Sequence, residues 1–189
     1  MSIPEIAFHL RGVLIAPLFI FAILCFSYET ENDWPIWSAG VLIFLLGFLL
    51  RIWAQQHLHY RLMVRKHLTT TGPYCFVRNP IYLGNILLCL GCVVVSELVW
   101  LVPIAFFYCF GIYSLVVRYE EGHLSEKYGE PYRQFILEVP RWFPRTIRFK
   151  NLGLTNKYFR ASVISEIQCL FLLLPFILKE VISSFIEHS

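Results

Sequence analysis

Charged side chains are scarce in this sequence. Asp, Glu, Lys and Arg make up 15% of the 189 residues, whereas a soluble domain carries about a quarter. Hydrophobic residues make up 57% and aromatic residues 17%, and the mean hydropathy is +0.60. This composition argues against an ordinary soluble domain, and the chain has no polar domain long enough to bind nucleic acid. The sequence predicts a protein whose core forms by packing of helices in lipid.

Several catalytic and metal-binding signatures are also missing. The sequence has no glycine-rich phosphate loop, no Gly-x-Ser-x-Gly elbow and no His-Glu-x-x-His pair. Its only close cysteine pair, Cys89 and Cys92, lies inside an apolar segment without further ligands, so we interpret the cysteines as packing residues and expect no metal site. We interpret His57 and His59 as surface or head-group contacts. No internal repeat or low-complexity run divides the chain, which we treat as one domain over 1–189.

Apolar runs of helical length recur along the chain. A straight span needs about 20 residues, so the third and fifth runs are short. The fifth contains Glu166 and Pro175, and we expect it to tilt, kink or lie partly at the interface. The first run lacks a small-residue cleavage site and is interpreted as a retained span. The fold class we predict is all-α, an integral membrane bundle of about five transmembrane helices. The five runs are Ile6–Phe26, Ile36–Trp53, Ile81–Val95, Leu98–Val117 and Val163–Leu178.

The distribution of charge predicts an orientation. Fourteen of the sixteen Lys and Arg residues lie in 51–78 and 118–160, whereas the connection 27–35 carries three acidic residues and no basic one. By the positive-inside rule, both basic segments and the N-terminus face the cytoplasm. We therefore expect a multi-pass protein of a bacterial inner membrane or the endoplasmic reticulum.

The stretch 68–85 holds the densest set of polar signals. A Gly-Pro turn leads to Asn79–Pro80, which predicts a helix start, because Asn offers a capping oxygen and Pro fits the first helical position. On the helix that follows, Tyr82 and Asn85 share a face, and Arg78 stands just before it. This stretch thus places a cation, an amide and a phenol at the N-terminal end of an apolar helix.

A second polar segment continues the fourth apolar run. Nothing breaks a helix before Gly122, so the helix should extend through Glu120 and place it on one face with Tyr113 and Leu124. A carboxylate at that depth is costly without a partner and is a functional candidate. We interpret the adjacent Glu121 as a solvated or lysine-paired charge.

The two segments together resemble a known superfamily. The pattern Thr-x-Gly-Pro-Tyr…Val-Arg-Asn-Pro-x-Tyr-x-Gly is followed by Glu-Glu…Leu…Tyr-Gly-x-x-Tyr…Val-Pro-Arg-x-x-Pro. It resembles the isoprenylcysteine carboxyl methyltransferase and phospholipid methyltransferase superfamily over 68–144. The resemblance implies a shared core over about 36–146, a C-terminal extension over 150–189, and a helical membrane protein that binds S-adenosylmethionine and releases S-adenosylhomocysteine.

The resemblance also implies roles for particular residues. Basic residues and loop amides suit the carboxylate of the cofactor, a glutamate suits its cationic groups, and tyrosines suit its sulfonium or adenine. The catalytic residues implied are Arg78, Glu120 and Arg118. The cofactor-binding residues implied are Lys66, His67, Leu68, Thr69, Tyr74, Asn79, Pro80, Ile81, Tyr82, Asn85 and Glu120.

The acceptor stays open. Eukaryotic carboxyl methyltransferases of the superfamily carry His where this chain has Asn79, and Arg where it has Val116. We favour an isoprenylcysteine-type carboxylate or a similar head-group oxygen, entering laterally from the bilayer. A phospholipid amine, a lipid phosphate and a small thiol are alternative acceptors, and a non-catalytic lipid-binding protein is the alternative to an enzyme. The sequence leaves the oligomeric state open.

Overall fold

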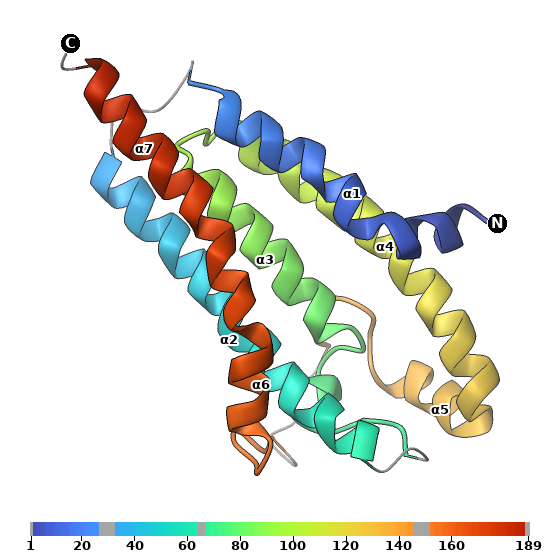
Figure 1. Cartoon of the computed structure of the whole chain (residues 1–189). Coiled ribbons are helices and arrows are strands. Elements are labelled where there is room, and N and C mark those ends of the chain that lie inside the picture. Colours follow the sequence, from blue (N-terminus) through green and yellow to red (C-terminus); the bar gives the residue numbers. More distant parts are fainter. Residues whose placement is uncertain (1, 27–32, 64–66, 146–151, 188–189) are drawn as a thin grey trace.

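The computed structural model describes residues 2–26, 33–63, 67–145 and 152–187, and these are helical with no β-strand among them. Helices α1, α2, α3 and α4 lie alongside one another in Figure 1, and the continuous stretch from α6 to α7 crosses in front of α2. The elements are α1 (Ile3–Leu24), α2 (Asp33–Met63), η1 (Gly72–Cys75), α3 (Pro80–Val95), α4 (Leu101–Tyr128), α5 (Glu130–Glu138), α6 (Phe159–Glu166), η2 (Ile167–Leu173) and α7 (Leu174–Glu187).

Helices α2 and α3 form the most closely packed pair in the bundle. A Cβ placed on Gly47 of α2 would lie 2.8 Å from the carbonyl oxygen of Gly84, and one on Gly91 of α3 would lie 2.7 Å from the backbone nitrogen of Phe44. Only glycine permits such close backbone approach, which is a frequent device between helices in membranes. Helix α4 packs against α1 and α3, and α6 packs against α2.

The prediction of a helical membrane bundle is confirmed. Four helical stretches among the described residues are long and apolar enough to cross a bilayer, whereas α3 has 16 residues and at about 1.5 Å per residue is shorter than a hydrocarbon core of about 30 Å. Large apolar side chains such as Leu49, Phe107 and Phe171 are exposed on the outside, as expected of a surface facing lipid. The four stretches are Ile3–Leu24, Trp34–Leu58, Leu101–Tyr128 and Phe159–Lys179.

The last apolar run changes helix type partway. It begins as α6, tightens into the 3₁₀ segment η2 and continues as α7, with Pro175 in the first turn of α7. Proline has no amide hydrogen to donate and its ring crowds the carbonyl four residues earlier, so the turn before it cannot keep α-helical bonding. The sequence left tilt, kink and an interfacial position open for this run, and the structure shows a change to 3₁₀ bonding just before Pro175.

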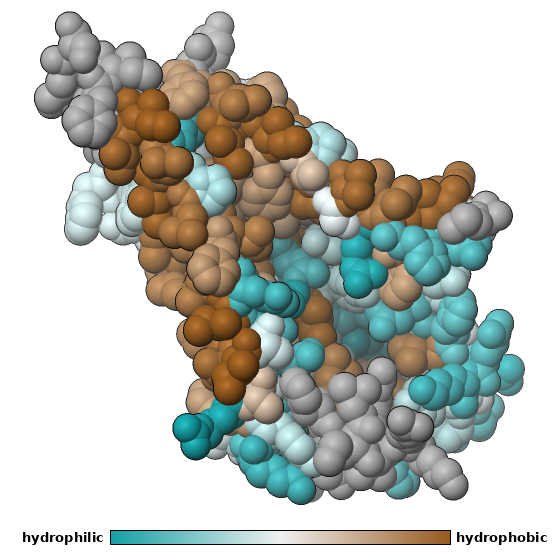
Figure 2. All heavy atoms as spheres, viewed as in Figure 1, coloured by the Kyte–Doolittle hydropathy of each residue, from teal (hydrophilic) through white to brown (hydrophobic). Residues whose placement is uncertain are grey.

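The polar parts of the molecule gather at one end. The end of α2, the start of α3, the end of α4 and α5 lie together at the lower right of Figure 1, far from the C-terminus. Figure 2 shows hydrophilic residues concentrated there, with hydrophobic residues over α7 and the upper bundle. The start of α1 lies beside the second half of α4, where the rings of Phe8 and Tyr119 are 5.1 Å apart. Assigning this end to the cytoplasm depends on the charge distribution alone.

Candidate functional site

A small cavity of about 100 Å³ joins the two sequence motifs. Tyr82 from the first turn of α3 and Glu120 from α4 both line it. The two motifs therefore face one another across one space, as the sequence predicted. The lining residues are Leu58, Tyr74, Arg78, Asn79, Pro80, Ile81, Tyr82, Glu120 and Leu124.

The loop before α3 reaches the cavity through a 3₁₀ turn. Gly72 opens that turn at a φ of +62°, a conformation that favours glycine, and α3 then begins at Pro80 as predicted. The prediction that the Asn79 side chain caps the helix is wrong, because it makes no cap bond. Its side-chain amide instead donates to Oε1 of Glu121 over 3.2 Å. At the start of α3 the backbone carbonyl of Asn79 accepts a hydrogen bond from the amide of Leu83.

Glu121 is the centre of a buried charge network. Arg78 donates to its Oε1 from Nε over 3.0 Å, and Arg141 donates to its Oε2 from Nη2 over 2.5 Å. Glu121 is 7% exposed, so the interpretation of Glu121 as a solvated or lysine-paired charge is wrong. The carboxylate ties the loop before α3 and the segment after α5 to α4, which fixes the position of the α3 start beside Glu120.

Arg78 donates three hydrogen bonds within this network. Besides the Glu121 pair, Nη1 donates to the carbonyl oxygens of Ile136 over 2.9 Å and of Val139 over 3.0 Å. The side chain is 9% exposed. Arg78 lines the small cavity, but its hydrogen bonds make it a brace between the α3 loop, α4 and α5.

Three titrating groups near this network have raised pKa values. Burial, followed by the negative charge of Glu121, raises the pKa of Tyr132 on α5. The hydrogen bond to Glu121 raises the pKa of Arg141, and burial raises the pKa of the Cys75 thiol in η1. Tyr132 and Cys75 thus stay protonated at neutral pH while Arg141 stays charged.

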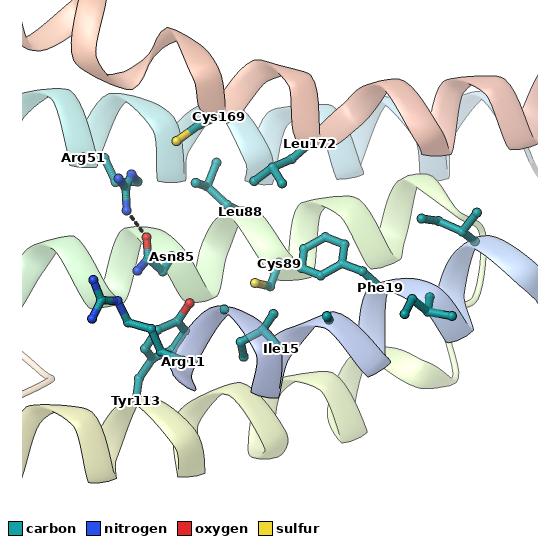
Figure 3. Close-up of a pocket in the computed structure, with 14 residues that line it drawn as sticks. Arg11, Ile15, Phe19, Arg51, Asn85, Leu88, Cys89, Tyr113, Cys169 and Leu172 are labelled. Carbon is teal, nitrogen blue, oxygen red and sulfur yellow. Dashed lines mark hydrogen bonds between the residues drawn. The ribbon is translucent and has the colours of Figure 1, made fainter. Parts of the chain in front are cut away.

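A second, larger cavity of about 500 Å³ lies deeper between α1, α2, α3, α4 and η2. Arg51 of α2 hydrogen-bonds to Asn85 of α3 at its polar end (Figure 3) and pairs with Glu166 of α6 over 2.6 Å. Tyr113 of α4 lines the same cavity, and its ring lies 5.5 Å from that of Tyr82. The Tyr82–Tyr113 pair therefore stands between the two cavities.

Comparison with known families supplies an identification. The family model described as phospholipid methyltransferase matches residues 36–131, just over half of the chain. The chain belongs to the phospholipid methyltransferase family. This family forms part of the isoprenylcysteine carboxyl methyltransferase-type group of membrane methyltransferases, which confirms the resemblance stated from the motifs.

Two curated relatives of this family member are metal-resistance proteins. The nickel-cobalt-cadmium resistance protein NccN of Alcaligenes xylosoxydans xylosoxydans is 24% identical over 148 residues, which cover 76% of this chain and 68% of the relative. The cobalt-zinc-cadmium resistance protein CzcN of Cupriavidus metallidurans is 26% identical over 142 residues, covering 72% and 64%. No solved structure matches. In the part of the chain that the structure describes, no three His, Cys, Asp or Glu residues are placed to hold a metal ion.

The structure does not bring every residue predicted for this methyltransferase-family site to the small cavity. Asn85 lines the larger cavity instead. His67 is exposed, Leu68 packs against the hydrophobic cluster of α5, Thr69 is half-buried, and none of the three lines either cavity. Lys66 lies outside the described residues.

Arg118 is also separate from the others. It is exposed on α4 and lines neither cavity, because two residues along a helix correspond to about 200° of rotation from Glu120. The sequence reasoning missed Arg11, Arg51 and Glu166. Each is an ionisable residue inside an apolar run, which was the available signal.

Proposed function

We propose that this chain is an S-adenosylmethionine-dependent methyltransferase that acts in the membrane on an oxygen of a lipid or lipidated acceptor. Membership of the phospholipid methyltransferase family supports a membrane methyltransferase. The observation that most supports cofactor binding is the cavity lined by both Tyr82 and Glu120, since it unites both motifs at the polar end of the bundle.

The groups around this cavity suit the cofactor chemically. Glu120 offers a carboxylate to the ammonium or sulfonium, and the rings of Tyr74 and Tyr82 offer faces for a cation or a base. A volume of about 100 Å³ is below the range of about 300–1,000 Å³ that is usual for ligand pockets. The cavity therefore takes one end of the cofactor, and binding of the whole molecule requires the surrounding side chains to separate or the remainder to lie outside it.

When bound, the cofactor supplies an already activated methyl group. Tyr82 and Glu120 orient its cationic end, and the Arg78–Glu121 network holds the α3 start in place around it. Orientation of reacting groups and exclusion of water contribute about 7–11 kcal/mol to lowering such barriers. An anionic acceptor oxygen needs no general base, so direct in-line transfer needs no further titrating residue. Arg118 has no part in this proposal.

Other acceptors require other steps. A phospholipid amine would have to lose a proton, and Glu120 is the carboxylate placed to receive it. A lipid phosphate would need no base, as for a carboxylate. A non-catalytic lipid-binding protein would keep the fold without using the cofactor.

Cofactor binding tests the proposal first. Calorimetry on the purified full chain should show saturable binding of S-adenosylhomocysteine that Glu120→Ala or Tyr82→Ala abolishes. Glu126→Ala, an exposed glutamate on the same helix, is the matched control and should bind normally. Absence of binding to the native chain, or normal binding by Glu120→Ala, would contradict the proposal.

Product analysis then identifies the acceptor. Membranes containing the native chain are incubated with methyl-labelled S-adenosylmethionine, and lipid and protein products are separated. Base-labile volatile label indicates an ester and supports an oxygen acceptor. Acid-stable label in lipid indicates N-methylation and would replace the oxygen acceptor by an amine.

A further inference from the structure

The larger cavity contains more positive than negative charge. Arg11 and Arg51 line it, and Glu166, which pairs with Arg51, is the carboxylate that balances one of them. Arg11 donates from Nη1 to the carbonyl oxygen of Phe8 over 2.8 Å and lies over the Phe8 ring. Among the described residues no carboxylate lies within ion-pair distance of Arg11. An ionisable residue within a membrane helix is by default a candidate for ligand binding.

The cavity is polar at one end and apolar at the other. Figure 3 shows Arg11, Arg51, Asn85 and Tyr113 together at one end, and Phe19 and Leu172 toward the other. Its volume of about 500 Å³ falls within the range of about 300–1,000 Å³ found for pockets that enclose small ligands. This lining matches a molecule with one charged head and an apolar chain.

The polar end also adjoins the proposed methyl-transfer site. Tyr113 lines the larger cavity and Tyr82 the smaller one, and their rings are 5.5 Å apart. A head group held beside Tyr113 would therefore be next to the Tyr82–Glu120 pair. Arg11 is the ninth residue of α1, about 12 Å along the helix at 1.5 Å per residue, a depth that a lipid head group reaches from the interface.

We propose that the larger cavity binds an anionic amphiphile, with its carboxylate or phosphate on Arg11 beside Asn85 and Tyr113 and its chain among the apolar residues. The identification of this molecule as the acceptor rests on the proposed function, whereas the binding site does not. Arg11 and Leu172 lie outside the residues that match the family model, so the match assigns them no role. Glu166 neutralises Arg51, which leaves Arg11 as the cation that selects the anion.

Displacement of a fluorescent amphiphile tests the site without any methyl transfer. The full chain in dodecyl maltoside is loaded with 11-(dansylamino)undecanoate, and four competitors of equal chain length are compared: hexadecanoate, hexadecyl phosphate, hexadecanol and hexadecylamine. One charge-assisted hydrogen bond corresponds to a preference of about 10-fold or more, so hexadecanoate or hexadecyl phosphate should compete at least about that much better than hexadecanol. The stronger of the two identifies the acceptor head group.

Arg11 variants locate the preference. Arg11→Gln should abolish the preference for the anionic competitors over hexadecanol, and Arg11→Lys should retain most of it. Arg133→Gln removes an exposed arginine of α5; it is the matched control and should leave the preference unchanged. Equal competition by hexadecanol in the native chain, or an unchanged preference in Arg11→Gln, would overturn the inference. Arg11 is exposed, so its replacement should not prevent folding, which normal S-adenosylhomocysteine binding by the variant would verify.

The two proposals fail separately in these experiments. A native chain that binds S-adenosylhomocysteine but shows no anion preference disproves the amphiphile site alone. A native chain that shows the anion preference but never binds S-adenosylhomocysteine disproves the methyltransferase and leaves an anion-selective lipid site.

Discussion

Replacement of Glu121 by alanine should destabilise the protein more than any other change at the polar end. The carboxylate is 7% exposed and is shared by Arg78, Asn79 and Arg141. Removal leaves the Arg78 charge buried, with the carbonyl oxygens of Ile136 and Val139 as its remaining acceptors among the described residues. Breaking a buried pair by removing one partner costs about 3–5 kcal/mol.

The solvent exposure of each arginine decides how much its ion pair with Glu121 contributes to the free energy of unfolding. The Arg78 side chain is 9% exposed and that of Arg141 is 34% exposed. Solvent screens the second pair, so Arg141→Ala should lower the free energy of unfolding by about 1 kcal/mol or less. Because the two carbonyls still bind Arg78, Glu121→Ala should lower it by about 3 kcal/mol, at the lower end of the range for buried pairs.

Unfolding by sodium dodecyl sulfate in mixed micelles, followed by far-ultraviolet circular dichroism, measures these differences. Glu126→Ala, an exposed glutamate one turn further along α4, should change the free energy of unfolding by less than about 0.5 kcal/mol. The reasoning is refuted if Glu121→Ala is as stable as Glu126→Ala. Equal losses for Glu121→Ala and Arg141→Ala would also refute it, because the exposed pair would then carry the energy.

Two further predictions concern packing and pH. Gly47→Ala should lower the free energy of unfolding by about 1–3 kcal/mol, because the added methyl group would overpack against Gly84. Gly111→Ala is the control and should leave it unchanged, because its added Cβ meets nothing within 4 Å. The same detergent titration compares the two variants, and equal stability would contradict the close contact between α2 and α3. For Tyr132, the folded pKa is raised above the ordinary value of 10.0, so its stabilising contribution is full below pH 10 and falls as pH rises further. Melting temperatures from pH 8 to 11 should show this fall in the native chain and a smaller one in Tyr132→Phe; equal slopes would contradict the assignment.

The helices and their order follow largely from the sequence. Each of the five apolar runs is helical in the structure, α3 begins at Pro80, and Pro175 accompanies the 3₁₀ segment. These features depend on neighbours within a few residues, on run length and on the missing amide hydrogen of proline. The helical extension through Glu120 was predictable for the same reason, although the helix passes Gly122 and ends at Tyr128, just before Gly129.

The partners of the polar side chains were not predictable in this way. Glu120 and Glu121 are adjacent and chemically identical, yet Glu120 lines the cavity and Glu121 binds two arginines. His57 was expected at the surface, but it is 7% exposed and bonds to Thr71 over 2.8 Å and to the carbonyl oxygen of Gly153 over 2.9 Å. Its second partner is 96 residues away in the sequence, beyond the reach of any local pattern.

The sequence by itself determined that this chain is a helical membrane protein of the methyltransferase type, because composition, run length and two local motifs are properties of the chain. Only the tertiary structure decided that Tyr82 and Glu120 share a cavity, that Arg51 pairs with Glu166, and that no carboxylate among the described residues pairs with Arg11. Helix rotation and contact between distant segments set those distances, and the free energy of a charge in an apolar surrounding depends on them.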